Sequence, residues 1–504
     1  MSLPNWLTAL PDAAQMRATD SWAITTRGVA SLDLMERAGA GLAALTAELV
    51  PSGRIVVVCG GGNNGGDGIV AARLLRAAGR EVDVLLTCPV EELSGDPGVN
   101  LSRLTGPPVA PWVSSAALEG AAGVIDAVLG TGFSGPPREP ALGAIRAING
   151  CSAVVVCADV PSGVDASTGE VAQEAVRATA TATFHAAKPG LWIYPGKAHA
   201  GTVRVIEIGI PDGAPGDANA GLLNKTVLDL IPRRSSSSTK FSEGSLMVVG
   251  GSSGLTGAPL MVVAAAQRTG AGYVTAAVPQ SLAPIFAARL LEAMSRVLPD
   301  AAGGFTPDGV APLTRMAEEV DAVVLGPGIG RSNGASQFAR GAASAVPAPM
   351  VLDADGLNAH AGRLELIADR DWPTVLTPHA GELARLLAIT SAEVQAKRLA
   401  HVRAAAATAD AVVLLKGDDT LIASPNGRVA ISASGTPALA TAGSGDVLSG
   451  VIGALLAKGM APFAAACAGA VLHAEAGRIA GEEHGVDSVI ASDVIAALGA
   501  ARQR

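Results

Sequence analysis

The sequence predicts an α/β protein built from two domains, each around a mostly parallel sheet. Short β-branched runs alternate with Ala/Leu-rich segments of helical periodicity along the chain. Polar, glycine-containing loops follow many of these runs, as they do at the carboxyl ends of parallel strands. The chain has 504 residues, of which 49% are hydrophobic and 3% aromatic. It therefore exceeds one ordinary core and must fill its interior with small aliphatic side chains, which suits parallel α/β layers.

Each half of the chain contains its own series of expected strands. Those of the first half lie within residues 54–60, 81–88, 123–130, 152–159 and 201–210. Those of the second half lie within residues 245–251, 272–278, 321–330, 349–356, 373–382 and 411–420. Residues 212–240 are rich in Pro, Gly, Ser, Asp and Asn, which is typical of a connection. We therefore expect a first domain at 1–215, a linker at 216–239 and a second domain at 240–504.

Charge and composition argue against several classes of function. A formal net charge of −9 would not attract nucleic acid or an anionic membrane. The chain does not open on a basic segment followed by an apolar core, and no run reaches the roughly 18 apolar residues of a membrane span. The five cysteines are scattered, mostly in apolar runs, so we expect buried thiols rather than disulfides. These features predict a cytoplasmic protein without nucleic-acid or membrane partners, and we expect it to form a homo-oligomer.

Three polar loops of the first half follow expected strands, at residues 60–68, 126–137 and 158–165. The first precedes an expected helix at 68–79, and its glycine spacing fits neither a dinucleotide loop nor a P-loop. If the loops converge at the ends of one parallel sheet, Asn64, Asp126 and Ser162 offer oxygen ligands that suit a weakly held, hard cation better than zinc. Alternatively, Asn63, Asp67 and Asp126 cap helices and tighten turns.

Taken together, these stretches resemble the NAD(P)H-hydrate epimerase domain over residues 10–215. The resemblance rests on GGGNNGGDG (60–68), VLGTGFSGPPREP (128–140) and ADVPSGVDASTGEV (158–171), with QMRATDSWAI (15–24) and TFHAAKPG (183–190). It implies a Rossmann-like α/β/α fold, a potassium site at Asn64, Asp126 and Ser162, and an acid/base role for Asp159. The residues that it implies for binding the hydrated nicotinamide cofactor are Asn63, Asn64, Gly65, Gly66, Asp67, Gly130, Thr131, Gly132, Phe133, Ser134, Gly135, Pro136 and Asp159.

In the second half, residues 441–459 (TAGSGDVLSGVIGALLAKG) predict a helix that begins near Asp446. The preceding Gly-Ser-Gly would leave backbone N–H groups free for an anion, and Asp446 is placed to act as a base toward a hydroxyl that attacks phosphorus. Alternatively, Asp446 is an ordinary helix cap. Lys416 at the end of an expected strand suits nucleotide phosphates, unless it is merely solvated at a turn. His379 is followed by Glu382, which raises the prospect of a ligand or magnesium role over a purely structural one.

These motifs resemble the ADP-dependent NAD(P)H-hydrate dehydratases, relatives of the ribokinase-like kinases, over residues 240–500. The other stretches that carry the resemblance are GGSSGLTGAP (250–259), LGPGIG (325–330) and LDADGLN (352–358). The resemblance implies a ribokinase-like α/β fold, catalysis by Asp446 and a divalent cation, magnesium, for which Glu382 is the candidate ligand. It implies ADP binding at Lys416, Gly417, Asp418, Asp419, Thr420 and Gly445, and binding of the hydrated cofactor at Ala258, Gly328, His379 and Asp446.

The two resemblances together imply a metabolite-repair enzyme that is both an isomerase and a lyase. Its substrates would be hydrated NADH and NADPH, with ADP as co-substrate and potassium at the epimerase site. Two other readings stay open at this point. One is a ribokinase-like kinase for a vitamin precursor, fused to an unrelated fold. The other makes the first domain a nucleotide-sensing or protein-binding module, which would not need Asp159.

Overall fold

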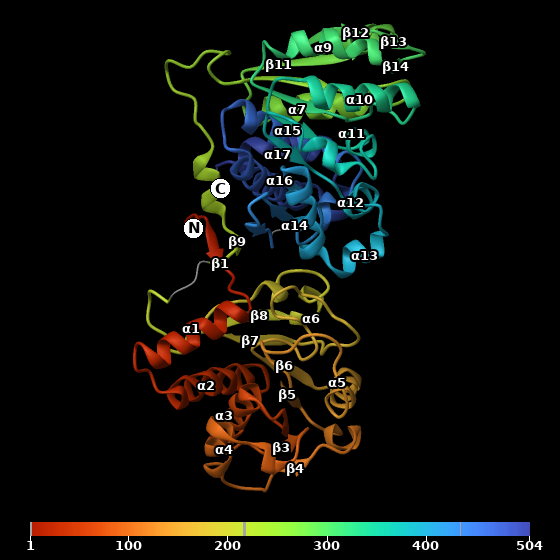
Figure 1. Cartoon of the computed structure of the whole chain (residues 1–504). Coiled ribbons are helices and arrows are strands. Elements are labelled where there is room, and N and C mark those ends of the chain that lie inside the picture. Colours follow the sequence, from red (N-terminus) through yellow and green to blue (C-terminus); the bar gives the residue numbers. More distant parts are fainter. Residues whose placement is uncertain (1–2, 215–217, 434, 504) are drawn as a thin grey trace. The chain divides into compact units, whose positions relative to one another are not determined.

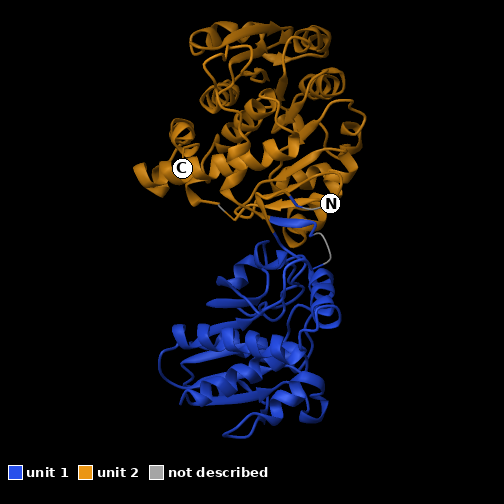
Figure 2. Ribbon diagram, turned by 90° about the vertical axis from the view of Figure 1, so that its left-hand side faces the viewer, with its two compact units in different colours: residues 1–3, 9–221 blue, residues 4–8, 222–504 orange. Residues whose placement is uncertain are grey.

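The computed structural model describes residues 3–214, 218–433 and 435–503 (Figure 1). The chain divides into two compact units, coloured separately in Figure 2: Leu3 with Ala9–Gly221 forms the first, and Pro4–Thr8 with Leu222–Arg504 form the second. The expected linker is not only a connection, because it contains strand β9 (Ala220–Leu223) and a 3₁₀ helix at Lys225–Leu230. Residues 216 and 217 of that linker lie outside the described residues.

The first unit contains, within the described residues, a seven-stranded sheet in the order β4-β3-β2-β5-β6-β7-β8. All neighbouring strands are parallel. The order reverses between β2 and β5, which creates a crevice outside the carboxyl ends of these strands. The strands are β2 (Ile55–Cys59), β3 (Val82–Leu86), β4 (Ala110–Pro111), β5 (Gly123–Ala127), β6 (Val154–Ala158), β7 (Ala180–Phe184) and β8 (Thr202–Ile206).

Helices cover both faces of this sheet, so the first unit is an α/β/α sandwich. Alternate residues of β2 point to opposite faces. Ile55 and Val57 pack in one core cluster with Ile69 of α3, whereas Val56 packs in another with Ile145 of α5. The helices are α1 (Ala13–Thr25), α2 (Ser31–Leu49), α3 (Asn63–Ala77), α4 (Gly95–Ser102), α5 (Ala141–Gly150) and α6 (Lys197–Ala200).

Helix α3 begins five residues earlier than the expected helix at 68–79. It starts at Asn63, so most of the glycine loop is the first turn and a half of a helix. The glycines permit this because α3 lies very close to the strand ends. A Cβ atom on Gly65 would lie 1.9 Å from the Gly60 carbonyl oxygen, and one on Gly68 would lie 2.6 Å from Ala127 Cβ.

Replacing Gly65 by alanine is therefore expected to destabilise the first unit by about 1–3 kcal/mol or more, as overpacking of a close-packed interior does. Denaturant or thermal unfolding measures the change. Gly62→Ala is the matched control, because a Cβ atom there meets nothing within 4 Å. Equal stabilities of the two variants would show that the close approach of α3 to Gly60 is not needed.

The second unit has, in the part of the chain described, an 11-stranded sheet in the order β1-β9-β20-β19-β18-β17-β16-β15-β10-β11-β12. Its strands from β12 to β18 are parallel neighbours, and β18, β19 and β20 pair antiparallel. The order reverses between β10 and β15. The strands are β1 (Leu7–Ala9), β9, β10 (Ser245–Val249), β11 (Tyr273–Pro279), β12 (Met294–Leu298), β15 (Ala322–Leu325), β16 (Met350–Leu352), β17 (Thr374–Leu376), β18 (Val412–Leu415), β19 (Leu421–Ala423) and β20 (Val429–Ile431).

Two long helices of the second unit lie in its core. Helices α15 (Ser444–Ala457) and α16 (Pro462–His484) are buried along most of their length, which explains why their sequences are apolar on nearly every side. The remaining elements are α7 (Gly257–Thr269), α8 (Ala283–Ala287), α9 (Val310–Ala317), α10 (Asn333–Ala345), α11 (Asp355–Asn358), α12 (Ala380–Leu387), α13 (Ser391–Ala396), α14 (Arg398–Ala409), α17 (Ala491–Ala501) and the hairpin β13 (Asp300–Ala301) with β14 (Gly304–Phe305).

The structure confirms the two α/β domains and the expected strands of both halves. All five cysteines are free thiols, and Cys59, Cys157 and Cys467 are buried. Among the described residues, no helix combines the length and the apolar character that crossing a membrane requires.

Candidate active sites

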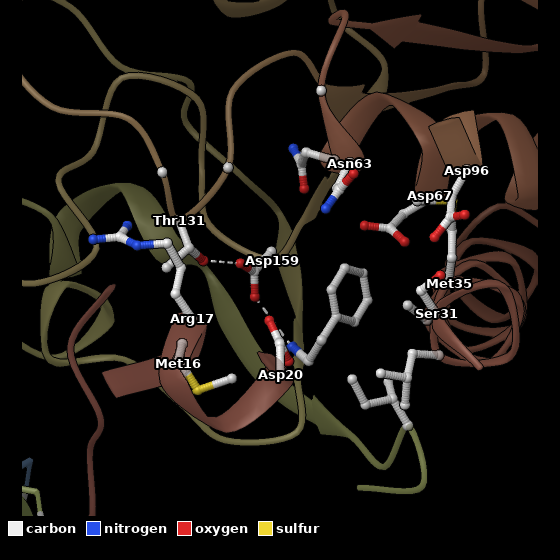
Figure 3. Close-up of a pocket in the computed structure, with 18 of the residues that line it drawn as sticks. Met16, Arg17, Asp20, Ser31, Met35, Asn63, Asp67, Asp96, Thr131 and Asp159 are labelled. Carbon is white, nitrogen blue, oxygen red and sulfur yellow. Dashed lines mark hydrogen bonds between the residues drawn. The ribbon is translucent and has the colours of Figure 1, made fainter. Parts of the chain in front are cut away.

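A cavity of about 660 Å³ lies at the carboxyl ends of β2, β5 and β6 in the first unit (Figure 3). It occupies the point where the strand order reverses, the usual ligand crevice of such sheets. Eight of the residues expected to bind substrate line it, namely Asn63, Asn64, Asp67, Gly130, Thr131, Gly132, Phe133 and Asp159. The other five do not: Gly65 and Gly66 are buried within α3, and Ser134, Gly135 and Pro136 are exposed.

Asp159 is held firmly at the side of this cavity. It follows β6 with a φ of 63°, a left-handed conformation that aspartate tolerates better than most residues. Its Oδ1 accepts hydrogen bonds from Lys188 Nζ and, at 3.2 Å, from the Phe184 backbone N–H. Its Oδ2 accepts one from the Thr131 hydroxyl, and Figure 3 shows these two side chains joined. The carboxyl group is therefore fixed from both oxygens.

The carboxyl groups of the cavity differ in their charge state. Burial raises the pKa of Asp159, but the Lys188 ammonium and the hydrogen bonds to the carboxylate outweigh burial and hold its pKa below the ordinary value. At Asp67 and Asp20, burial raises the pKa, and the negative charge of Asp159 raises it further. An ionised carboxylate thus shares the cavity with a carboxyl group that retains its proton well above the usual pH. Such a division suits proton transfer in both directions.

Sequence analysis missed Lys188, Asp20 and Arg17, all of which line the cavity. Lys188 lies in the TFHAAKPG stretch, four residues after the end of β7, so its place near the carboxyl end of a buried strand was a usable signal. Asp20 and Arg17 lie on α1, before the sheet begins, and no strand-end argument would place them here.

A compact polar cluster lies beside the cavity. Asp126 is fully buried, and its Oδ1 and Oδ2 accept hydrogen bonds from the Ser162 hydroxyl (2.6 Å) and backbone N–H (2.8 Å). The Asn64 amide donates to the Leu129 carbonyl at 3.1 Å, while its Oδ1 is buried without a hydrogen-bond partner. The three expected cation ligands are thus brought to one region, and one of them presents an unsatisfied buried oxygen, as a cation ligand would.

In the second unit, the start of α15 forms a second candidate site. The helix begins at Ser444, two residues before the expected start, after Gly443 in a left-handed conformation with φ of 88°. Its first backbone N–H groups, including those of Gly445 and Asp446, have no carbonyl partner within the helix. The site therefore offers N–H donors and the positive end of the helix dipole to an anion.

Asp446 is half-buried in the first turn of α15. Burial and the negative charge of Asp353 raise its pKa to about 7, while the Lys416 ammonium acts in the opposite direction. A carboxyl group with this pKa can take up and release a proton near neutral pH.

Lys416 brings the end of β18 into the same site. Its Nζ lies 3.1 Å from Asp353 Oδ1 and 3.7 Å from Glu382 Oε2. A Cβ atom on Gly445 would lie 3.5 Å from that Nζ, so the two predicted ADP-binding residues are neighbours. Asp353 is fixed in turn by the Ser449 hydroxyl of α15, which donates to Oδ2 at 2.6 Å.

The turn after Lys416 contains the two acids that the sequence places in a nucleotide-binding stretch. Asp419 is buried, and its Oδ2 lies 3.0 Å from Nε of Arg398, which is also buried. This ion pair neutralises the Asp419 carboxylate inside the protein. The Thr420 hydroxyl donates to the Gly417 carbonyl at 2.8 Å and so closes the turn, while Asp418 is exposed.

The residues expected to bind the hydrated cofactor come from two strand ends and two helix starts, the second of them being Asp446 on α15. Gly328, with a φ of 66°, follows β15, and a Cβ atom on it would lie 3.5 Å from that of Ala258 at the start of α7. His379 follows β17 and caps α12: its Nδ1 accepts from the Gly381 N–H at 2.9 Å. Burial lowers the pKa of His379, and its ring is half exposed.

Glu382 also completes the cap of α12. Its Oε2 accepts the His379 backbone N–H at 2.9 Å. In the described ranges, no three His, Cys, Asp or Glu side chains are grouped so that they could hold a metal ion. A magnesium ion at Glu382 would therefore need most of its ligands from a bound nucleotide and from water, as is common for this ion.

Comparisons with known proteins cover both units. The family described as YjeF-related protein N-terminus matches residues 31–190, and the family described as NAD(P)H-hydrate dehydratase matches residues 246–499. The bifunctional NAD(P)H-hydrate repair enzyme of Salinibacter ruber is 39% identical over 96% of this chain and 94% of its own. That of Moorella thermoacetica is 39% identical over 96% and 95%, and that of Escherichia coli is 33% identical over 96% and 92%.

Among solved structures, the ADP/ATP-dependent NAD(P)H-hydrate dehydratase of Bacillus subtilis, co-crystallised with ATP and Mg²⁺, is similar to part of the chain. It is 28% identical, covers 56% of this chain and 98% of its own, and superposes with a TM-score of 0.49.

Proposed function

Because the chain belongs to the family of bifunctional NAD(P)H-hydrate repair enzymes, we propose that it epimerises hydrated NADH and NADPH and dehydrates one epimer at the expense of ADP. The observation that carries this proposal is that each unit has its own site at the carboxyl ends of its parallel strands, with a carboxyl group in each that can exchange a proton. A kinase fused to an unrelated module is not favoured, because the relatives match along nearly the whole chain.

For the first unit, we assign the cavity to the hydrated nicotinamide cofactor. Exchange of configuration at C6 requires the hydroxyl proton to be removed as the C6–N1 bond breaks, which leaves an aldehyde at C6 and a proton on N1. The bond then reforms on the other face of the aldehyde as N1 loses its proton and the oxygen regains one. The ionised Asp159 is the base, with Oδ2 beside Thr131 and the cavity. The start of α3, at Asn63 and Asn64, offers helix N–H groups to a phosphate of the substrate.

We propose that potassium binds at Asn64, Asp126 and Ser162. The buried, unpartnered Oδ1 of Asn64 supports this, as does the all-oxygen character of the three side chains. When bound, a potassium ion would supply positive charge next to the loops that shape the cavity. The residues of this chain that it would order are Asn64 at the start of α3 and Leu129, whose N–H donates to the Ser162 hydroxyl at 2.8 Å.

Replacing Asn64 by alanine is accordingly expected to raise the potassium concentration for half-maximal epimerisation by about tenfold or more, since it removes one ligand and leaves Asp159 in place. A second readout is the melting temperature, which should rise less on addition of KCl than it does for the parent. Asn149→Ala is the control: Asn149 also bonds a backbone carbonyl, that of Ala175, but lies on α5. An unchanged response to KCl would remove Asn64 from the cation site.

For the second unit, we assign ADP to Lys416–Thr420 and Gly445, and the hydrated cofactor to Ala258, Gly328, His379 and Asp446. Asp446 takes the proton of the C6 hydroxyl as that oxygen attacks the β-phosphorus of ADP and AMP leaves. The ring nitrogen then expels phosphate from C6, and loss of a proton from C5 restores the dihydropyridine. Lys416 and the N–H groups of α15 counter the charge of the phosphates. A magnesium ion, when bound, would neutralise part of the same charge.

The test supplies mixed epimers of hydrated NADH with ADP, magnesium and potassium, and follows the absorbance of the dihydropyridine. We expect complete conversion of both epimers, with AMP and phosphate formed in equal amounts. Recovery of NADH without consumption of ADP, or consumption of ADP without recovery of NADH, would contradict the proposed reaction. The same assay with hydrated NADPH compares the two substrates.

A further inference from the structure

Lys188 is a buried cation in the first unit that the assignments above leave without a role. Its side chain is 1% exposed, yet the residue contributes to the lining of the cavity. A lysine ammonium carries three donors. Here they are directed at Asp159 Oδ1, at the Thr183 hydroxyl (3.0 Å) and at the Phe184 carbonyl (2.9 Å). Lys188 therefore has no remaining donor for a ligand, and its contacts point to an action through Asp159.

The charges around Asp159 show why a cation is needed there. Of the charged and titratable groups in the same cavity, Asp20 on α1, Asp67 on α3 and Asp96 on α4 are acids, and Arg17 on α1 is basic. His185, three residues before Lys188 in the sequence, has its pKa lowered by burial. Burial favours the neutral form of Asp159, whereas Lys188 favours the ionised form at hydrogen-bond distance.

We propose that Lys188 is a positioning residue of the epimerase site: it fixes Asp159 through Oδ1 and keeps that carboxylate ionised, leaving Oδ2, beside Thr131, to exchange a proton with the substrate. This inference rests on the proposed acid/base role of Asp159. The left-handed backbone at Asp159 fits this role. In that conformation the carboxylate is held between Phe184 at the end of β7 and Thr131 in the loop after β5.

The experiment measures epimerisation of one purified epimer in the absence of ADP, so that the second unit cannot consume either form. Rates are corrected for spontaneous epimerisation and recorded from about pH 4, close to the ordinary pKa of an aspartate, to about pH 9. In Lys188→Met, burial of Asp159 is no longer offset, so the acid limb of the profile should move to higher pH. The parent's rate divided by the variant's rate should therefore be larger at the acid end of the range than at the alkaline end, by a factor of about ten or more. An adjacent opposite charge changes the ionisation constant of a carboxyl group by at least that factor.

Lys188→Arg should keep the parent's acid limb, because it keeps the charge, even if the rate falls at every pH. Lys188→Gln keeps hydrogen bonding without the charge and should shift the limb as Lys188→Met does. These variants also cover the case in which the methionine variant does not fold. An acid limb that stays at the parent's position in the folded Gln or Met variant overturns the proposal, because a purely structural lysine lowers the rate equally at all pH values.

Two controls separate the possible causes of failure. Dehydration of the accepted epimer by the same variants, with ADP present, reports whether the second unit is folded and active, and thermal unfolding reports whether the first unit is folded. Lys458→Met removes another buried lysine, paired with Glu243 in the second unit, and should leave the epimerisation profile unchanged. If Asp159→Asn still epimerises at the parent's rate, the assigned role of Asp159 fails. If it does not, and Lys188→Gln keeps the parent's acid limb, only the inference on Lys188 fails.

Discussion

Replacing Asp446 by asparagine is expected to slow dehydration by about 10²- to 10⁴-fold, the usual contribution of a general base, while leaving ADP binding nearly unchanged. The amide has the shape of the carboxyl group and preserves the start of α15, but it cannot accept the hydroxyl proton. Single-turnover rates with the accepted epimer measure the loss, and a direct binding titration measures the affinity for ADP. Epimerisation without ADP should be unaffected.

The same variant tests the protonation of Asp446. Because its pKa is raised to about 7, the carboxylate fraction grows as the pH rises through this value, and the parent's dehydration rate should grow with it. The residual rate of Asp446→Asn should lack that rise. Asp493→Asn is the matched control, since Asp493 stands in the first turn of α17 and accepts the Ile490 N–H at 3.0 Å. Near-normal turnover of Asp446→Asn would leave Asp446 as a helix cap only.

Replacing Asp159 by alanine is expected to abolish interconversion of the epimers while dehydration of the accepted epimer continues. Progress curves on mixed epimers should then stop part-way, after the accepted form has been consumed. Adding a chain that carries Asp446→Asn but an intact first unit should restart them, because the stranded epimer is free in solution. The assay must be fast relative to spontaneous epimerisation.

Asp83→Asn serves as the control for this second prediction. Asp83 lies on β3 and pairs with Arg54 at 2.7 Å, so the substitution removes an aspartate of the same sheet from a partly exposed ion pair. Such pairs contribute little to stability. An Asp159→Ala protein that consumes both epimers as fast as the parent would show that the cavity binds the substrate without moving its protons.

Strand ends were the part of the molecule that the sequence predicted best. Buried parallel strands are continuous apolar runs, so their ends, and the polar residues that follow, are visible without a structure. Asn64, Asp126, Asp159 and Ser162 in the first unit were all placed in this way, and the structure gathers them around one crevice. Lys416 of the second unit was placed in the same way, whereas Asp446 was placed by the Gly-Ser-Gly that precedes an expected helix.

Contacts between segments that are distant in the sequence were harder to predict. The glycines of residues 60–68 read as a loop because glycine is a poor helix former, but the close approach of α3 to Gly60 overrides that propensity. Asp20 reaches the cavity from α1, which has no fixed place until the sheet exists. Asp419 lies in the stretch that the resemblance assigns to ADP, and only the fold brings its carboxylate to Arg398 on α14.

Strands β1 and β9 were also not expected, since Leu7–Ala9 is short and Ala220–Leu223 lies in a stretch of linker composition. Both segments are strands because they pair at the edge of the second unit's sheet, next to β20. The order of β1, β9 and β20 means that the chain contributes to the second unit's sheet before and after the whole first unit.

This arrangement has a consequence for biosynthesis. β1 leaves the ribosome about 420 residues ahead of β20, an interval on the order of 20 to 80 seconds at about 5–20 residues per second. β9 is synthesised about midway between β1 and β20. β1 can therefore pair with β9 long before the rest of the second unit's sheet is synthesised. Strand β1 of the second sheet is thus translated before the strands of the first unit, and the edge that it forms with β9 is joined to the rest of the sheet only after β20 has been translated.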